Sequence, residues 1–216
     1  MVPSLCESDL VFFVFTGGPG HGKDYLLGLL MLDQWFQENA SFFSESAEWT
    51  ITGHKMTGDD FADRDTRIAF QKTVAAAGML KYHLMVRRAV RSGKRYGFFS
   101  RHMIDGKVYV DGGIEELEFI SGFTREEMSR GVTHVIWCGP PPEKDYEQHN
   151  PDDPTKKGFR FESYSRAVDL GQAVLVAYRD HHHSVHEVHG TEDPNDKYRA
   201  LRRRLHELDP NIPDLE

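Results

Sequence analysis

The stretch VFTGGPGHGKDYLLGLL, residues 14–30, decides the fold. From Gly17 to Lys23 it matches G-x-x-x-x-G-K, the pattern of a phosphate-binding loop. The apolar run LVFFVFT at 10–16 precedes the loop, as expected of a strand that is buried on both faces in a parallel sheet, and leucines at helical spacing follow it. Because strand, glycine loop and helix occur in this order, we predict a phosphate-binding loop.

Each part of such a loop helps to hold an anion. Glycines allow the backbone N–H groups to turn inward, the N-terminus of the following helix contributes its dipole, and the Lys23 ammonium reaches the outer phosphates. The predicted nucleotide-binding residues of this stretch are Gly17, Gly18, Pro19, Gly20, His21, Gly22, Lys23, Asp24 and Tyr25.

Asp24 departs from the pattern, which has Ser or Thr after the lysine to hold a magnesium ion. A carboxylate about 4 Å from a phosphate charge costs on the order of 4 kcal/mol per charge pair at an effective dielectric of about 20. A divalent metal between the two groups reverses the sign of this effect, and carboxylates are good ligands for Mg²⁺. Asp24 is therefore compatible with nucleotide binding if the metal is present.

Strand-like and helix-like segments alternate along the rest of the chain. This order predicts an α/β fold of the P-loop NTPase type, with three α/β/α layers and a parallel five-stranded sheet. The stretch after Pro140–Pro142 is dense in Pro, Asp, Lys and Gly, so we expect a lid at approximately 142–162 within a single domain, 1–216. The further strands are expected at 41–45, 95–100, 133–139 and 184–189, and the helices at 23–38, 60–92, 124–128, 164–180 and 195–208.

Composition narrows the function classes. The chain has 216 residues, 39% of them hydrophobic and 28% charged, which is ordinary for a globular protein. Its formal net charge of -8 argues against a general affinity for nucleic acid or anionic membranes. Cys6 and Cys138 have no metal-ligand spacing, no apolar run is long enough to cross a bilayer, and no charged leader is evident. We expect a soluble cytoplasmic protein, with no signal for an oligomeric state.

Three further segments support a resemblance to a known family. TGGPGHGK comes early, SESAE follows the second expected strand, and SRHMIDG follows the third. With the lid and the helix after it, this order resembles the P-loop kinase-like family that includes the bacterial nicotinamide riboside kinase domain and its eukaryotic ATP/GTP-binding relatives. More distantly it resembles deoxynucleoside and thymidylate kinases. The resemblance covers nearly the whole chain, but only the phosphate loop is a specific motif.

The resemblance implies an altered metal site. In that family the third strand ends in Asp-Arg-Ser or Glu-Arg-Ser, whose acid helps to organise the metal, whereas this chain has Ser100 followed by Arg101. The family's hydroxyl has become Asp24 and its acid has become Ser100, so we expect the two side chains to share one Mg²⁺ with their roles exchanged. Two alternatives stay open: both groups were lost by drift, or Asp24 faces solvent as a helix N-terminal acid.

The resemblance also suggests residues for the chemistry. Glu45 matches the carboxylate that accepts a proton from the attacking hydroxyl, with Glu48 as a fallback; its alternative is a helix N-terminal carboxylate. Arg101 would reach the acceptor or the phosphates, unless it forms a surface salt bridge. In the lid, Lys156, Lys157 and Arg160 would stabilise the migrating phosphoryl group, unless they form a solvated face.

The expected function is magnesium-dependent transfer of the γ-phosphate of ATP or GTP to a small nucleoside- or nucleotide-like acceptor. One alternative is an ATP/GTP-binding regulator with little catalysis, and another is a kinase acting on a hydroxyl in a nucleic-acid polymer. The histidine-rich segment 180–189 could bind a transition metal, but it lies where His is favourable against a helix dipole. The basic segment 87–95 could contact nucleic acid, but it closes a predicted long helix, whose C-terminus favours cations.

Overall fold

The computed structural model describes residues 5–54, 56, 60, 62–109, 132–148, 163–181, 184–189 and 193–215. Within these ranges the strands form one sheet in the order β2-β3-β1-β4-β5, and every neighbouring pair is parallel. The strands are β1 (Val11–Thr16), β2 (Ala40–Phe43), β3 (Tyr96–Ser100), β4 (Val132–Cys138) and β5 (Val185–Val188). The predicted parallel five-stranded sheet is therefore confirmed.

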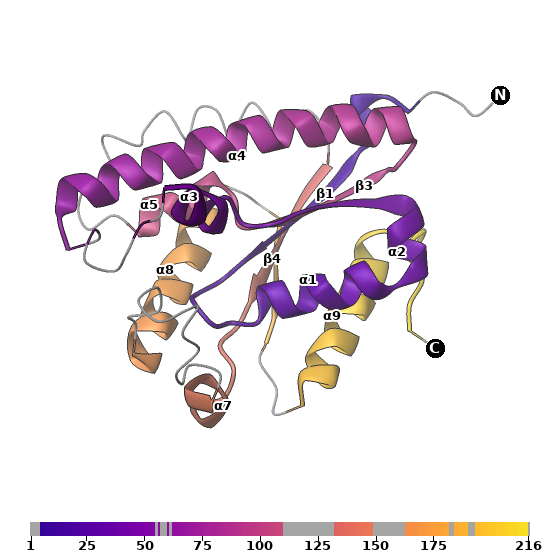
Figure 1. Cartoon of the computed structure of the whole chain (residues 1–216). Helices are drawn as coiled ribbons and strands as arrows, with labels where there is room; N and C mark the ends of the chain where they lie inside the picture. Colours follow the sequence, from indigo (N-terminus) through magenta and orange to yellow (C-terminus); the bar gives the residue numbers. More distant parts are fainter. Residues whose placement is uncertain are drawn as a thin grey trace.

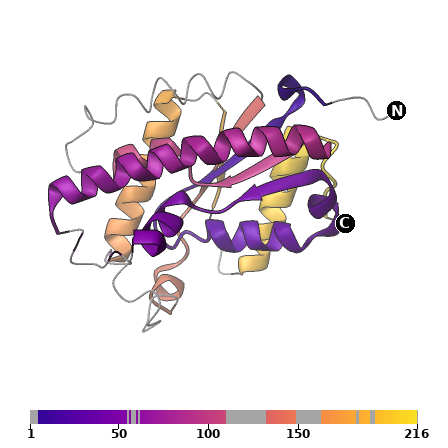
Figure 2. The same cartoon turned by 45° about the horizontal axis from the view of Figure 1, so that its top comes forward.

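The central strand β1 separates two apolar layers. Side chains alternate across a strand, so Phe13 and Phe15 face one layer and Phe12 and Val14 face the other. On the first side the strand packs against α1 (Lys23–Leu32), α2 (Gln34–Asn39) and α9 (Pro194–Leu208). On the other side it packs against α4 (Arg64–Ser92), α5 (Met103–Val108) and α8 (Tyr164–His181). Figures 1 and 2 show α4 on the opposite side of the sheet from α1 and α9, which gives the predicted three layers.

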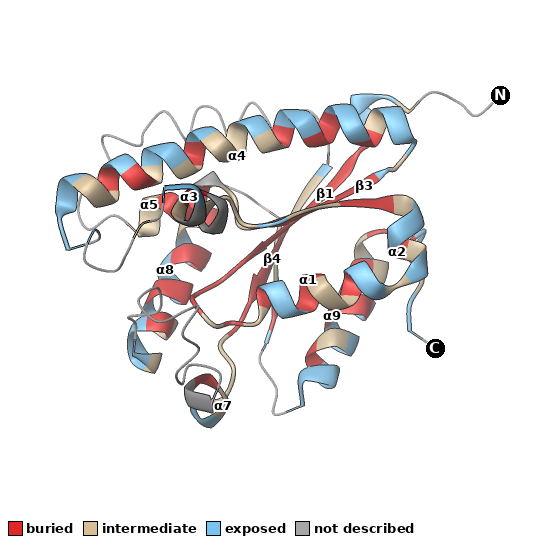
Figure 3. Cartoon of the chain, in the orientation of Figure 1, coloured by how far each residue is buried: buried red, intermediate tan, exposed pale blue. Residues whose placement is uncertain are grey.

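Burial of β1 on both faces explains its uninterrupted apolar sequence. All six of its residues are buried, as Figure 3 shows along the length of the strand. The two neighbours of β1 are in register with it: Val11 pairs with Tyr96 of β3 and with Val132 of β4. The carboxyl ends of these strands therefore lie at one edge of the sheet, where ligands bind in parallel α/β folds.

The helices differ from the predictions in several places. The expected helix at 23–38 is divided at Asp33, whose carboxylate accepts hydrogen bonds from the backbone N–H groups of Trp35 and Phe36 and so caps α2. The sequence reasoning did not predict α3 (Ser46–His54), α7 (Glu143–Gln148), α5 or the short 3-10 helix η1 (Glu7–Asp9). The helix expected at 124–128 lies outside the described residues. No helix in the described ranges has the length and apolarity needed to span a membrane.

Candidate functional site

The predicted phosphate loop lies between the end of β1 and the start of α1. Gly17, Gly20 and Gly22 all have positive φ, a backbone conformation that favours glycine. Gly22 forms the N-cap of α1 in the left-handed region, with φ 77°. Lys23 is the first residue of the helix, and its side chain is only 5% exposed. The loop thus has the local geometry with which backbone N–H groups and a lysine surround a phosphate.

The His21 side chain is directed into the protein. Its Nδ1 atom lies 3.0 Å from the Gly18 nitrogen and 2.9 Å from the Cys138 carbonyl oxygen. A Cβ on Gly171 of α8 would lie 2.4 Å from its Cε1 atom, so the ring fits only because this neighbour is glycine. Burial lowers the pKa of His21 to about 4, so the imidazole is neutral near pH 7. Any contribution of His21 to nucleotide binding would come from its main chain.

Lys23 lies beside two acids. Its Nζ atom is 3.7 Å from Asp24 Oδ2 and 3.9 Å from Glu45 Oε2. Glu45 comes between β2 and α3, and its Oε1 atom is 2.9 Å from Arg101 Nε. The structure thus brings Lys23, Glu45 and Arg101 together at the carboxyl edge of the sheet. The side chain of the fallback acid Glu48 lies outside the described residues.

Asp24 and Ser100 are in direct contact. The Ser100 hydroxyl donates a hydrogen bond of 2.5 Å to Asp24 Oδ1, across the space between α1 and β3. Desolvation opposes ionisation of Asp24, but the charge of Lys23 and the Ser100 hydrogen bond outweigh it and lower the pKa of the carboxyl group. The Asp24 side chain is still 63% exposed, so it is accessible to a ligand. The two groups predicted to share a metal are therefore neighbours.

The Asp24 carboxylate and the Ser100 hydroxyl are oxygen donors of the kind that Mg²⁺ prefers. Mg²⁺ prefers oxygen ligands at about 2.0–2.1 Å in an octahedron, which places adjacent ligands about 2.9 Å apart. The Asp24 and Ser100 oxygens are 2.5 Å apart as a hydrogen-bonded pair, so they would move apart by a few tenths of an ångström to bind one ion together. Among the described residues no group of three or more His, Cys, Asp or Glu could hold a metal ion, but Mg²⁺ is commonly held by one or two protein groups together with phosphates and water.

Arg101 has a strained backbone conformation, and its side chain lies beside Asp105, an acid for which the sequence predicted no role. Arg101 has φ 59°, and its backbone nitrogen donates to the Phe15 carbonyl oxygen at 2.8 Å. Asp105 lies 3.7 Å from Arg101 NH1 and accepts hydrogen bonds from Thr16, Tyr178 and the His102 nitrogen. Burial opposes the charge of Arg101, but Glu45 and Asp105 raise its pKa well above the ordinary value.

The Arg101 side chain is 15% exposed, so its ion pairs lie largely below the surface. A non-glycine residue at positive φ persists only where its surroundings hold it there. The surface salt bridge considered for Arg101 therefore does not describe its environment.

Lys197 of α9 is a second residue that sequence reasoning missed. It is 7% exposed, and its ammonium donates to the carbonyl oxygens of His21 and Gly139 at 2.7 and 2.9 Å. A signal was present, because Lys197 lies in the first turn of a helix, where the dipole disfavours a cation. Because Lys197 is also buried, its ammonium needs protein acceptors, and the phosphate loop supplies one of them.

The described part of the predicted lid contains α7, which contacts the phosphate loop. A Cβ on Gly20 would lie 2.6 Å from the ring of Tyr146, a buried residue of α7. The helix α7 therefore packs against the loop at a glycine. Lys156, Lys157 and Arg160 lie outside the described residues, and so does the rest of the lid from 149 to 162.

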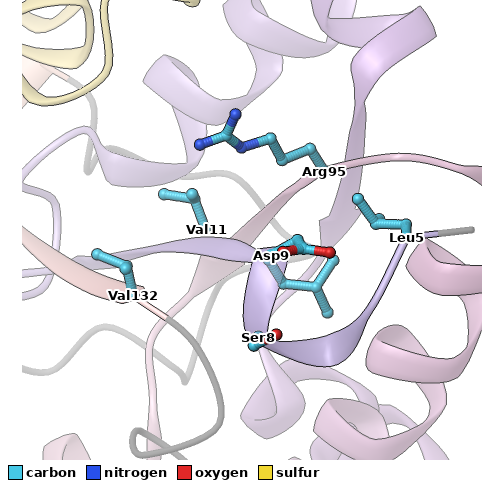
Figure 4. Close-up of a pocket in the computed structure, with 7 residues that line it drawn as sticks. Leu5, Ser8, Asp9, Val11, Arg95 and Val132 are labelled. Carbon is cyan, nitrogen blue, oxygen red and sulfur yellow. The ribbon is translucent and has the colours of Figure 1, made fainter. Parts of the chain in front are cut away.

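A pocket of about 400 Å³ lies at the opposite end of the sheet (Figure 4). Its lining includes Val11 and Val132, the first residues of β1 and β4, and Arg95, which precedes β3. A strand of six residues such as β1 spans about 17 Å. The pocket is therefore separate from the phosphate loop and is not a candidate acceptor site.

Comparison with known proteins supports the fold. No protein-family model and no curated protein sequence matches the chain. Among solved structures it is similar to a NadR protein in complex with NR, with a TM-score of 0.63 and 16% sequence identity. That match covers 97% of this chain and 55% of the NadR chain, so this chain spans about half the length of that relative. A shikimate kinase from Acinetobacter baumannii in complex with shikimate matches with a TM-score of 0.46 and 14% identity, over 92% of this chain and 94% of that one.

The comparison and the sheet agree with the resemblance that the sequence motifs predicted. The parallel sheet and the glycine loop between β1 and α1 are present, and the similarity extends over nearly the whole chain. The chain therefore shares the fold of the NadR protein, a parallel sheet with a glycine loop between β1 and α1.

Proposed function

We propose that this protein transfers the γ-phosphate of ATP or GTP, in the presence of Mg²⁺, to a small nucleoside- or nucleotide-like acceptor. The observation that carries the proposal is the convergence of Lys23, Glu45, Arg101 and the Asp24–Ser100 pair beside the phosphate loop. Phosphoryl transfer depends mainly on positioning and charge stabilisation, which such a group of residues supplies.

Each residue has a distinct role in this proposal. The loop N–H groups and Lys23 bind the phosphates, and Asp24 with Ser100 would hold Mg²⁺, which neutralises phosphate charge. Glu45 accepts the proton of the acceptor hydroxyl, and Arg101 orients the acceptor or a phosphate. Lys157 and Arg160 of the lid complete the charge stabilisation when the lid closes.

One observation favours the alternative of an ATP/GTP-binding regulator. Both carboxylate oxygens of Glu45 face cations, Oε1 toward Arg101 at 2.9 Å and Oε2 toward Lys23 at 3.9 Å. A carboxylate in this arrangement also serves as a structural ion-pair partner. Glu45 acts as a base only if the acceptor hydroxyl reaches a lone pair of the carboxylate that these cations leave open.

The experiment that separates the two functions combines turnover with binding. Phosphoryl transfer from ATP and GTP is measured over a panel of nucleosides and nucleotides. The panel begins with NR, because the structurally similar NadR protein was solved with it. Glu45→Gln should lower turnover by about 10²- to 10⁴-fold with little change in nucleotide affinity. Glu38→Gln on α2 removes the same charge from an exposed position and serves as the control.

Transfer that Glu45→Gln abolishes and Glu38→Gln leaves intact supports the kinase. Tight nucleotide binding without transfer to any acceptor supports the regulator. Transfer to a nucleic-acid polymer, accompanied by salt-sensitive binding of DNA or RNA, supports the polymer kinase.

A further inference from the structure

Lys197 of α9 links the phosphate loop to the residue that follows β4. Its Nζ atom donates to the carbonyl oxygen of His21, inside the loop, and to that of Gly139, directly after β4. The same atom lies 3.9 Å from the position that a Cβ would occupy on Gly22. Figure 1 shows α9, which carries Lys197, beside α1, and the two helices share one apolar cluster. A single side chain thus joins α9, the phosphate loop and the residue after β4.

The contact with His21 determines the orientation of the next amide. The peptide bond between His21 and Gly22 is trans, since the described chain contains no cis peptide bond. In a planar trans peptide the C=O and N–H bonds point in opposite directions. With the His21 carbonyl held toward Lys197, the Gly22 N–H points away from α9. Amides of glycines in such loops form the inner surface that binds phosphate.

The charge of Lys197 is not balanced by an acid in the described part of the chain. Its hydrogen-bond partners are the two carbonyl groups, and no carboxylate of the described residues forms an ion pair with it. Burial lowers its pKa, as expected for an ammonium surrounded by neutral groups. A buried, uncompensated cation is costly without an opposite charge nearby. A polyphosphate in the loop would supply that charge.

We propose that Lys197 is a positioning residue that holds the His21–Gly22 peptide in the phosphate-binding orientation and favours binding of the nucleoside triphosphate. This inference rests on the proposed function only in taking the loop as a polyphosphate site. Lys197 contacts the outward carbonyl side of the loop, whereas Lys23 acts on the phosphates directly. The contact with Gly139 ties this side of the loop to the segment that leads into α7.

The test compares Lys197→Met with the matched control Lys94→Met. Lys94 also donates to two main-chain carbonyls, that of Gln37 in α2 at 2.6 Å and that of Ala40, the first residue of β2, at 3.1 Å. Both variants therefore lose a lysine that contacts two carbonyl groups, but only one of them touches the phosphate loop. Lys197→Gln, which keeps an NH₂ donor, and Lys197→Arg, which keeps the charge, are included in case the methionine variant does not fold.

Two quantities are measured on the full chain. The first is the ¹H–¹⁵N resonance of the Gly22 amide without ligand, and the second is the affinity for magnesium tripolyphosphate and magnesium ATP by calorimetry. Lys197→Met should shift the Gly22 resonance and weaken both ligands by about 10- to 100-fold, the effect of losing a hydrogen bond from a charged group. Lys197→Arg should restore part of the affinity, and Lys94→Met should change neither quantity.

The outcomes distinguish this inference from the proposed function. If Lys197→Met or Lys197→Gln lowers stability but leaves the Gly22 resonance and both affinities unchanged, Lys197 is only structural and the inference is overturned. The same holds if the wild-type protein binds no tripolyphosphate. If the wild type binds tripolyphosphate in a Lys197-dependent manner but transfers phosphate to no acceptor, the inference stands and the proposed kinase function fails.

Discussion

Replacement of Asp24 by alanine should have opposite effects on nucleotide binding with and without magnesium. Without metal, the carboxylate repels the phosphates that Lys23 attracts, so its removal should strengthen binding. With Mg²⁺ present, the carboxylate is a ligand of the ion, so its removal should weaken binding. The reversal of sign is a stronger test than either change alone, because misfolding would weaken binding in both conditions.

The magnitude follows from the position of the carboxylate. Asp24 Oδ2 is 3.7 Å from the Lys23 ammonium, so a phosphate oxygen that contacts this ammonium at about 2.8 Å lies within about 6.5 Å of the acid. At about 4 Å, one charge pair contributes about 1 kcal/mol in water and about 4 kcal/mol at an effective dielectric of about 20. Since the side chain is 63% exposed, the lower part of this range applies. Metal-free ATP should therefore bind Asp24→Ala about 5- to 30-fold more tightly than wild type.

Calorimetric titration of ATP and GTP, with magnesium and then with excess chelator, measures both effects. With magnesium, Asp24→Ala should bind at least about tenfold more weakly, the loss expected for a ligand to the ion. Glu38→Ala changes the net charge equally at an exposed position on α2 and should change neither affinity. If Asp24→Ala binds more tightly in the presence of magnesium as well, or if wild-type binding does not depend on the metal, then Asp24 is not a ligand of the ion.

Three further predictions concern stability. Asp105→Ala should lower the free energy of unfolding by about 3–5 kcal/mol, because it leaves the largely buried Arg101 without one of its acids. Tyr178→Phe removes only one hydrogen bond to Asp105 and should cost about 1 kcal/mol. Equal losses of stability in urea denaturation would contradict this difference. The pKa of His21 is about 4 in the folded protein and 6.5 in the unfolded chain, so the unfolded state binds more protons between these values and stability falls as pH drops from 6.5 to 4. The loss is about 3 kcal/mol, and urea midpoints should decline less over this range in His21→Gln than in wild type; parallel curves would exclude His21 as the cause. Gly18→Ala should destabilise the fold, since its Cβ would lie 2.2 Å from the Ala167 carbonyl oxygen. In Gly28→Ala, in α1, the added Cβ meets nothing within 4 Å, so this variant should be neutral or stabilising by up to about 1 kcal/mol. A thermal unfolding temperature that is lower for Gly28→Ala than for Gly18→Ala would refute the packing at Gly18.

Much of the fold could be predicted because its signals are local. The continuous apolar run of β1 reflects burial on both faces, and the glycines at positive φ reflect the turn into α1. The boundary between α1 and α2 at Asp33 was not predicted. Apolar residues at helical spacing continue on both sides of Asp33, and one aspartate is weak evidence that a helix ends there. The single-domain organisation, 1–216, and the roles of Lys157 and Arg160 stay predictions.

The candidate site was predictable in part. Lys23 and the loop followed from one motif, and the pairing of Asp24 with Ser100 was expected only through the family resemblance. Asp105 lay inside a quoted segment, SRHMIDG, but nothing in its neighbours along the chain indicates that it accepts hydrogen bonds from Thr16 and Tyr178. Residues that act through distant partners have no local pattern.

Local sequence was sufficient to predict a strand, a glycine loop and a helix in succession from residue 10 onward, and to show an aspartate where a hydroxyl is usual. Which groups meet there depends on how the chain folds. Ser100 reaches Asp24 because β3 lies next to β1 in parallel register, and Lys197 reaches His21 because α9 packs beside α1. These partners are 76 and 176 residues apart in the chain. Strand order and helix packing depend on burial of the whole apolar surface, and this is a property of the complete fold that no short segment encodes.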